Sequence, residues 1–261
     1  MPKVKDIAEA IERFAPSNLQ EDYDNSGLQV GFPEMEVKAI MLCLDVTEDI
    51  LQEAVDKECN LIVSHHPVIF RGLKHLTGST NIERIMIDAI KQGVAIYSAH
   101  TNLDSAFGGV SYEIGHLLGL KDMRVLDPKN DGENTGLGVI GMVEPTPKLE
   151  FLRKVKDTFN VKALKYSSQS PQLVVRKVAA CGGSGAFLIK EALKEKADII
   201  ITGDVKYHDF TSFATDIIIA DIGHYESELC ARKIIQHIIK DNFPDTDIFT
   251  SEKEVNPISY I

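Results

Sequence analysis

Short apolar runs alternate along the chain with segments in which apolar residues recur every three or four positions. In the first half, apolar runs of strand length lie at 38–46, 60–64 and 94–99, and helical periodicity covers 47–58 and 81–93. Unbroken apolar strands separated by helices are typical of sheets that helices cover on both faces. The pattern therefore predicts an α/β fold.

A polar segment rich in Asp, Asn and Gly, 127–136, interrupts this alternation. Because such a composition is typical of a loop, we place the connection between two lobes there. The first lobe is expected at 1–126, completed by the C-terminal segment, and the second at 137–261. Beyond the loop we expect strands at 136–143, 174–181, 198–203 and 216–223, and helices at 145–159, 186–197 and 224–239.

The chain also contains a faint internal repeat. A shift of 138 residues lays 38–67 over 176–205 without a gap, and apolar and polar positions agree almost throughout although identities are few. Any two strand–helix–strand units resemble each other, so this stretch alone leaves duplication open. Each half, however, also ends an apolar run with the pattern His-x-x-x-acid, at 100–104 and at 224–228. We therefore expect two related α/β lobes with mixed sheets flanked by helices.

Four histidines stand directly after apolar runs, where an α/β fold gathers its ligand-binding loops at the carboxyl ends of the strands. Two of them are followed by an acid four positions later, a spacing that puts both side chains on one face where the segment is helical. We expect a helix for the later pair and a loop for the earlier one. Imidazoles and carboxylates gathered in this way indicate a metal site. The residues are His65, His66, His100, Asp104, His224 and Glu228.

The adjacent histidines His65 and His66 favour two ions rather than one. Neighbouring residues of a strand point to opposite faces, and Pro67 keeps the chain extended there, so the two rings can diverge toward different ions. Mixed histidine and carboxylate ligands suit zinc, iron or manganese. Because a pair of such ions activates water and polarises an electrophile, the pattern indicates a metal-dependent hydrolase.

Three polar residues near these positions are candidates for catalysis: His100, Asp204 and His208. Asp204 takes the place of the second adjacent histidine in the repeat. It is either a group that supports the metal ligands or transfers protons, or the cap of the helix that follows. The turn CGGSG at 181–185 is either a tight packing turn or a cradle for an anionic substrate. The glycine-bearing turn at 24–31 has no chemistry assigned to it.

Composition narrows the classes of function. The 261-residue chain carries 28 Lys and Arg against 39 Asp and Glu, a net charge of −11, and it has no basic run, which argues against nucleic-acid binding. No apolar run approaches the roughly 20 residues of a membrane span, and the amphipathic N-terminal segment lacks the apolar core of a signal peptide. The four widely spaced cysteines are expected to be reduced thiols in the core. We therefore expect a cytoplasmic globular protein without nucleic-acid or membrane partners.

A set of motifs occurs in a fixed order along the chain. They are YDNSGLQVG (23–31), SHHPVIF (64–70), SAHTNLD (98–104), CGGSG with ITGDVKYHD, and GHYESE (223–228). In this order and approximate spacing they resemble the GTP cyclohydrolase I type 2 homologue family, also described as NGG-interacting-factor-like dinuclear metal proteins. The resemblance covers essentially the whole chain. It departs at Tyr23, where the family usually has Trp, and in lacking the domain that longer members insert between the halves.

The resemblance implies a fold, a metal site and an assembly. Similar proteins bind two divalent metal ions in a cleft between two α/β lobes and assemble as ring-shaped homohexamers. Carried over position by position, the resemblance implies that Glu228 bridges the two ions and that His100 lies close by. The implied metal ligands are His65, His66, Asp104, His224 and Glu228.

The leading hypothesis is a metal-dependent hydrolase of a small, nucleotide-like molecule. Hydrolysis follows from the chemistry of a dinuclear site, whereas GTP cyclohydrolase activity is implied by the resemblance alone. Opening of a purine imidazole ring, phosphoester hydrolysis and amide hydrolysis all stay open. Two other hypotheses stay open as well: a non-enzymatic metal carrier or regulatory protein, and an interaction protein in which the ions serve only stability.

Overall fold

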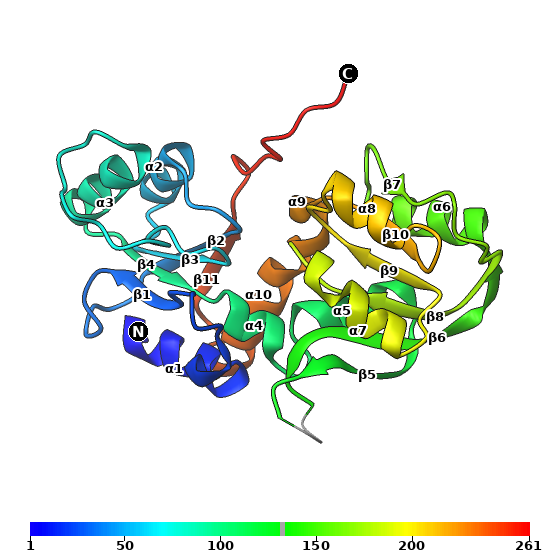
Figure 1. Ribbon diagram of the computed structural model, residues 1–261. Coiled ribbons are helices and arrows are strands. Elements are labelled where there is room, and N and C mark those ends of the chain that lie inside the picture. Colours follow the sequence, from blue (N-terminus) through cyan, green and yellow to red (C-terminus); the bar gives the residue numbers. More distant parts are fainter. Residues whose placement is uncertain (131–133) are drawn as a thin grey trace. The chain divides into compact units, whose positions relative to one another are not determined.

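The computed structural model describes residues 1–130 and 134–261 (Figure 1). Contacts divide the chain into two compact units. The first unit comprises Met1–Leu103 and Ala231–Pro257, and the second comprises Asp104–Cys230 and Ile258–Ile261. Each unit contains a mixed sheet flanked by helices, which confirms the expected fold class.

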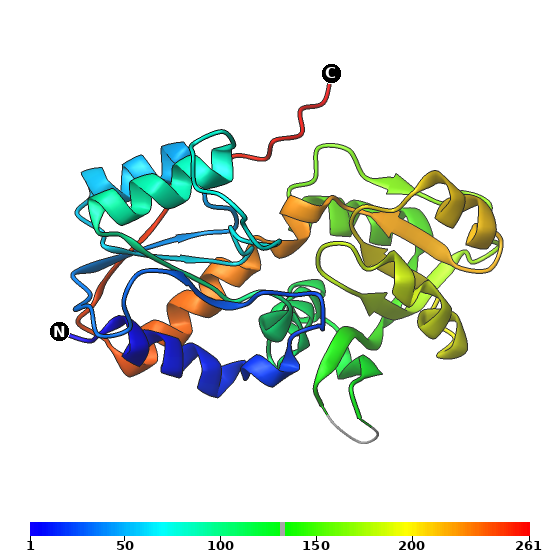
Figure 2. The same ribbon diagram turned by 60° about the vertical axis from the view of Figure 1, so that its left-hand side comes forward.

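The first unit is built on a five-stranded sheet in the order β1-β4-β3-β2-β11. The strands β11, β2, β3 and β4 run parallel, and β1 pairs antiparallel with β4. Figure 2 shows α2 and α3 on one face of this sheet and α1 and α10 on the other. The elements are α1 (Val4–Phe14), η1 (Ser17–Leu19), β1 (Gly27–Val30), β2 (Ala39–Cys43), α2 (Glu48–Asp56), β3 (Leu61–Ser64), α3 (Asn81–Gln92), β4 (Ala95–Ser98), α4 (Thr101–Ser105), α10 (Cys230–Asn242) and β11 (Asp247–Thr250).

Local sequence explains the helices that frame the histidine-bearing strand ends. Thr47 caps α2, because its hydroxyl accepts a hydrogen bond from the amide of Ile50 at 3.2 Å, and Thr80 caps α3 in the same way. Gly93 ends α3 with a left-handed backbone, φ 67°, that favours glycine. These helix boundaries return the chain to the sheet, where every residue of β2, β3 and β4 is buried.

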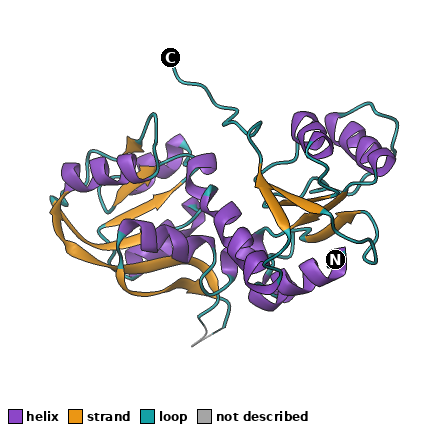
Figure 3. Cartoon of the chain, turned by 180° about the vertical axis from the view of Figure 1, so that it is seen from behind, coloured by secondary structure: helices purple, strands orange, loops and turns teal. Residues whose placement is uncertain are grey.

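The second unit is built on a six-stranded sheet in the order β5-β6-β8-β9-β10-β7 (Figure 3). The strands β8, β9 and β10 run parallel, and the outer pairings are antiparallel. The elements are α5 (Val110–Leu118), β5 (Lys121–Pro128), β6 (Gly136–Pro147), α6 (Lys148–Thr158), β7 (Lys165–Tyr166), β8 (Val174–Ala180), η2 (Ala186–Leu188), α7 (Ile189–Lys194), β9 (Ile199–Thr202), α8 (Tyr207–Phe213), β10 (Ile218–Asp221) and α9 (His224–Glu228).

The two units repeat one topology. In each, an antiparallel edge strand precedes three parallel strands, with neighbours in the order β1-β4-β3-β2 in the first unit and β7-β10-β9-β8 in the second. The flanking helices also follow the same chain order, from α1 to α5 and from α6 to α10. The 138-residue shift seen in the sequence moves Leu61–Ser64 onto Ile199–Thr202, which are the bounds of β3 and β9. The repeat is therefore structural.

The unit boundaries differ from the ranges expected from the sequence. Residues 127–136, of which 131–133 lie outside the described residues, join β5 to its neighbour β6 in the second unit's sheet. The chain instead passes into the second unit within α4 and returns to the first between Cys230 and Ala231. A polar segment of this kind predicts a turn, but it does not show whether the turn joins two strands of one sheet or two separate units. This explains the difference.

The structure can also be compared with the expectations for two helical segments, for the cysteines and for membrane-spanning helices. The expected loop after His100 is the helix α4, and the expected C-terminal helix is divided into α9 and α10. All four cysteines are free and buried, as expected. Among the described residues, no helix combines the length and the apolar character needed to cross a membrane.

Candidate metal centre

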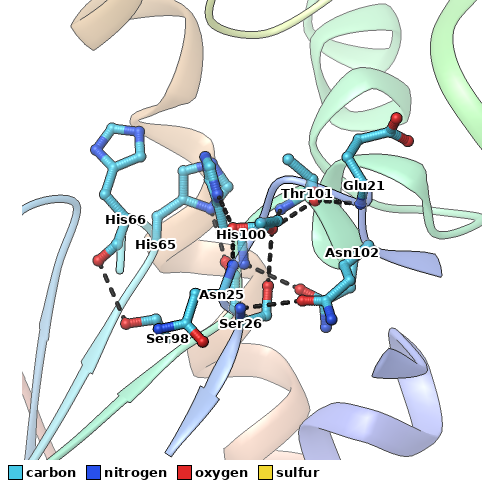
Figure 4. Close-up of polar contacts among 12 residues, drawn as sticks. Glu21, Asn25, Ser26, His65, His66, Ser98, His100, Thr101 and Asn102 are labelled. Carbon is cyan, nitrogen blue, oxygen red and sulfur yellow. Dashed lines mark hydrogen bonds and ion pairs between the residues drawn. The ribbon is translucent and has the colours of Figure 1, made fainter. Parts of the chain in front are cut away.

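Three histidines meet at the carboxyl edge of the first unit's sheet (Figure 4). His65 and His66 follow β3, and His100 follows β4, its parallel neighbour in the sheet. Ring nitrogens of the three lie within 4.8 Å of one another. Their ring centroids are separated by 5.0 to 5.4 Å. The structure thus gathers His100 with the two adjacent histidines, as the sequence predicted for strand ends.

Both adjacent histidines are oriented through Nδ1. His65 Nδ1 lies 2.8 Å from the carbonyl oxygen of Ala99, and His66 Nδ1 lies 2.9 Å from Oδ1 of Asp45. An acceptor at Nδ1 places the ring proton there, so the lone pair stands on Nε2. The hydroxyl of Ser98 also donates to the backbone carbonyl of His66, a contact drawn in Figure 4. Histidines that bind metals are typically held in this way.

His100 is held by Asp24, a residue of the turn to which the sequence assigned no chemistry. Asp24 Oδ1 lies 2.7 Å from His100 Nδ1, and its other oxygen accepts hydrogen bonds from the amide and hydroxyl of Thr101. Burial alone would raise the pKa of Asp24, but the hydrogen bonds from His100 and Thr101 outweigh it and hold that pKa well below its usual range. Asp24 therefore stays a carboxylate.

The same carboxylate explains why α4 is helical. Asp24 accepts the Thr101 amide at 3.0 Å, so it satisfies an amide at the start of the helix and places negative charge there. The sequence around His100 contains no such cap, and a loop was the natural expectation. Because α4 is a helix, the spacing between His100 and Asp104 is helical, and the earlier prediction of a loop is wrong.

The second unit gathers a matching set around α9. His224, the first residue of α9, lies between two carboxylates: its Nδ1 is 2.7 Å from Asp204 Oδ2 and its Nε2 is 2.9 Å from Glu228 Oε2. Glu228 is buried, with its side chain 4% exposed. A carboxylate oxygen of Asp104 lies within 4.8 Å of one of Glu228. The predicted helical pair His224 and Glu228 is therefore a real pairing.

The CGGSG turn packs against this pair. A Cβ added at Gly183, where φ is +57°, would lie 2.1 Å from Oε1 of Glu228 and 3.2 Å from Cε1 of His224. The Gly183 amide donates to the hydroxyl of Ser227 at 2.9 Å, and the Gly185 amide donates to that of Thr202. These contacts favour the packing turn over the anion cradle, since the Gly183 amide is used to fix α9 and the Gly185 amide is used on Thr202 at the end of β9.

The three candidate catalytic residues differ in whether they lie near the clustered histidines and carboxylates. Asp204 is not the cap of α8, because the N-cap of that helix is Lys206; the helix-cap interpretation is wrong, and Asp204 supports His224 instead. His208 lies exposed on α8, where its ring contacts that of Tyr207. Only His100 and Asp204 of the three lie among the clustered residues.

Sequence reasoning missed two residues of the site, Asp24 and Asp45. Asp45 lies near the end of the apolar run at 38–46, two residues after β2, so an acid at a third strand end was a usable signal. Asp24 precedes β1 by three residues and is 76 residues from His100, so no local pattern links the two.

The donor chemistry of both sets fits divalent metal ions. Imidazole nitrogens and carboxylate oxygens are the ligands of zinc, iron and manganese sites. The carboxylates at Nδ1 of His66, His100 and His224 match the arrangement that orients metal-binding histidines. The described residues thus include groups that can hold a metal ion.

Taken together, these features define an α/β protein of duplicated topology with histidine and carboxylate clusters at its strand ends. The chain belongs to the DUF34/NIF3 (NGG1p interacting factor 3) family, whose sequence model matches residues 2–257. A relative from Clostridium acetobutylicum, named GTP cyclohydrolase 1 type 2 homolog, is 34% identical over 99% of this chain and 98% of its own. NIF3-like protein 1 of Drosophila melanogaster is 30% identical over 98% of this chain and 88% of its own.

Solved structures show the same fold. A hypothetical protein of Staphylococcus aureus has a TM-score of 0.91 at 24% identity and covers 99% of both chains. Reduced HcgD from Methanocaldococcus jannaschii has a TM-score of 0.82 at 27% identity and covers 96% of this chain and 98% of its own. The family expected from the motifs is confirmed by the family model that matches residues 2–257 and by the relatives at 30% identity or more.

Proposed function

We propose that the protein is a metal-dependent hydrolase that holds two divalent ions and acts on a small, nucleotide-like substrate. The observation that supports this most directly is the orientation of the histidines, each of which has a carboxylate or carbonyl oxygen at Nδ1. Surface histidines need no such partner, whereas metal-binding histidines typically have one. The proposed ligands are His65, His66, Asp104, His224 and Glu228.

The ligands of the proposed site are contributed by both units of the chain. The first unit supplies His65 and His66, and the second supplies Asp104, His224 and Glu228. Catalytic metal sites use about three protein ligands per ion and leave a position open for water, so five residues suffice for two ions when one of them contacts both. As the family resemblance implies, we propose that these five residues would hold the two ions and that Glu228 would contribute to both.

The chemistry of such a site is hydrolytic. Bound divalent ions supply Lewis acidity and lower the pKa of water toward neutrality. His100 provides the proton transfers: Asp24 fixes its Nδ1–H, so that Nε2 is the atom that takes a proton from water or gives one to the leaving group. The carboxylate also stabilises the protonated ring, as in other Asp–His pairs of hydrolytic enzymes.

A nucleotide-like substrate is supported by aromatic side chains beside His100. The ring of Phe70 lies 6.2 Å from that of His100 and 6.2 Å from that of Tyr23. Phe70 is 43% exposed and Tyr23 64% exposed, so both offer open ring surface on which a planar base can stack. The names of the bacterial relatives point to the same class of molecule.

The proposal is tested by loading the purified protein with zinc, manganese or ferrous iron and measuring turnover of a panel of nucleotides, phosphoesters and amides. His66→Ala should lose one ion and abolish turnover, whereas His237→Ala, which changes an exposed histidine of α10, should leave both unchanged. Fully loaded protein that turns over nothing in the panel would contradict hydrolysis. Transfer of its ions to an apo-acceptor would then identify a metal carrier.

A further inference from the structure

The segment that follows β11 runs beside the carboxyl end of β2. The strands pair in parallel register, with Thr250 opposite Leu42, and the amide of Ser251 donates to the carbonyl of Leu42 at 2.9 Å. The chain therefore continues past the end of β2 toward the residues that follow that strand. The next charged residue that turns inward is Glu254, whose side chain is 4% exposed.

The Glu254 carboxylate is fully engaged with the backbone after β2 and with α10. Its Oε1 accepts hydrogen bonds from the amides of Leu44 and Asp45, and its Oε2 lies 2.6 Å from Nη1 of Arg232. Charged hydrogen bonds of this kind, largely removed from water, are among the stronger ones in proteins. Glu254 thus ties the 44–45 backbone to α10.

The residue held in this way is the one that orients His66. Asp45 Oδ1 lies 2.9 Å from His66 Nδ1, yet the Asp45 side chain is 61% exposed. A carboxylate so open to water gains little from packing, so its position depends on where the backbone places it. In the first unit, the two amides of that backbone are held by Glu254, which also balances the positive charge of Arg232, while the Leu44 carbonyl accepts the His66 amide at 2.8 Å.

We propose that Glu254 is a positioning residue for His66: by holding the backbone of Leu44 and Asp45, it keeps the Asp45 carboxylate on Nδ1 of the imidazole. This inference rests on the proposed function, in which His66 binds a metal ion. Without Glu254, Asp45 would leave the ring, and the ion bound by His66 would be held less tightly. Loss of a residue that orients a metal-binding histidine typically weakens metal affinity by about 10- to 100-fold.

A second buried carboxylate offers a matched control. Glu53 of α2 accepts hydrogen bonds from the hydroxyl of Ser251 and from the amides of Glu252 and Lys253. It therefore anchors the same segment as Glu254 from another side. Among the described residues, the hydrogen bonds and ion pair of Glu53 lie on this segment and on Lys57, and not on the 44–45 backbone. Loss of Glu53 loosens the segment while leaving the contact between Glu254 and that backbone in place.

The test compares Glu254→Gln, Glu254→Asp and Glu53→Gln in the full chain. The measurements are metal affinity and stoichiometry by calorimetry with zinc, the melting temperature of the metal-free protein, and the tautomer of His66 from ¹⁵N NMR. Glu254→Asp keeps the charge but withdraws the carboxylate from the two amides, and it serves where the Gln variant does not fold.

We expect both Glu254 variants to bind one of the two ions about tenfold more weakly and to lose the single Nδ1–H tautomer of His66. We expect Glu53→Gln to lower the melting temperature with metal affinity and tautomer unchanged. Equal effects of the Glu254 and Glu53 variants on affinity, or an unchanged His66 tautomer in the Glu254 variants, would overturn the inference. His66→Ala that keeps both ions would overturn the proposed metal role instead.

Discussion

Asp204 and His224 lie at the ends of neighbouring parallel strands, and Oδ2 of the first is 2.7 Å from Nδ1 of the second. Asp204 adopts a left-handed backbone, φ 53°, a conformation that Asp tolerates better than most residues. This conformation places its side chain beside His224. The contact therefore depends on both the strand register and an unusual backbone angle, which together orient the Asp204 carboxylate toward the His224 ring.

Replacement of Asp204 should weaken metal binding without unfolding the protein. In Asp204→Asn the amide can no longer hold Nδ1–H with a full negative charge, so His224 becomes a weaker and less well oriented ligand. We expect a loss of about 10- to 100-fold in affinity for one ion, measured by calorimetry. Asp216→Asn, at an exposed carboxylate of the same unit, is the control and should bind both ions as the wild type does. Equal affinities in the two variants would contradict the role of Asp204.

Gly183 should be intolerant of any side chain. In Gly183→Ala the new Cβ would clash with Oε1 of Glu228 at 2.1 Å, and the left-handed backbone adds strain. Gly93→Ala imposes similar strain, at φ 67°, but its Cβ meets nothing within 4 Å. We expect the backbone strain to cost both variants about 1 kcal/mol of stability, and only Gly183→Ala to lose metal as well. Calorimetry and urea unfolding separate the two effects; retained metal in Gly183→Ala would show that Glu228 can move without consequence.

Asp24 should affect catalysis more than metal content. Asp24→Asn removes the charge that fixes and stabilises His100, so turnover should fall by about 10²-fold or more, while elemental analysis still finds two ions. Thr101→Val removes the hydroxyl that donates to Asp24 and accepts from the Glu21 amide, but it leaves the contact between Asp24 and His100, so it serves as a milder comparison. Loss of an ion in Asp24→Asn would instead make His100 a metal ligand, and unchanged turnover would remove His100 from the mechanism.

Stability in acid should depend on Glu53. Burial would raise the pKa of Glu53, but hydrogen bonds from the Ser251 hydroxyl and the Glu252 amide outweigh it and lower the pKa from 4.5 to about 2. A folded-state pKa below the unfolded one means that the contribution to stability is fully present above about pH 5 and is lost as the pH falls toward 2.

Urea unfolding at a series of pH values measures this contribution directly. The difference in unfolding free energy between wild type and Glu53→Gln should be largest near neutral pH and shrink between pH 5 and 2. Glu53 forms an ion pair with Lys57, which is charged throughout that range, so the change reports the carboxylate. A difference that stays constant down to pH 2 would contradict the assignment.

The sequence predicted the parts of the fold and site that depend on local patterns. The apolar runs located β2, β3, β4, β9 and β10, and the 138-residue shift located the repeat because it compares like elements. The histidines after those strands were identifiable because parallel strands bring their carboxyl ends to one edge. The pairing of His224 with Glu228 followed from helical spacing alone.

The features that the sequence did not reveal depend on contacts between distant residues. Asp24 caps α4 and holds His100 from 76 residues away, so α4 was expected to be a loop. The strand β11 pairs with β2 across about two hundred residues, and only that pairing brings Glu254 to the site. No periodicity within either segment carries such information.

The most direct test of the central claim is a crystal structure of the metal-loaded protein, with anomalous difference maps and elemental analysis of the same sample. We predict two divalent ions per chain, bound by His65, His66, Asp104, His224 and Glu228, with Glu228 in contact with both. Imidazoles of the first unit that bind no ion, or a single ion held by other residues, would contradict it.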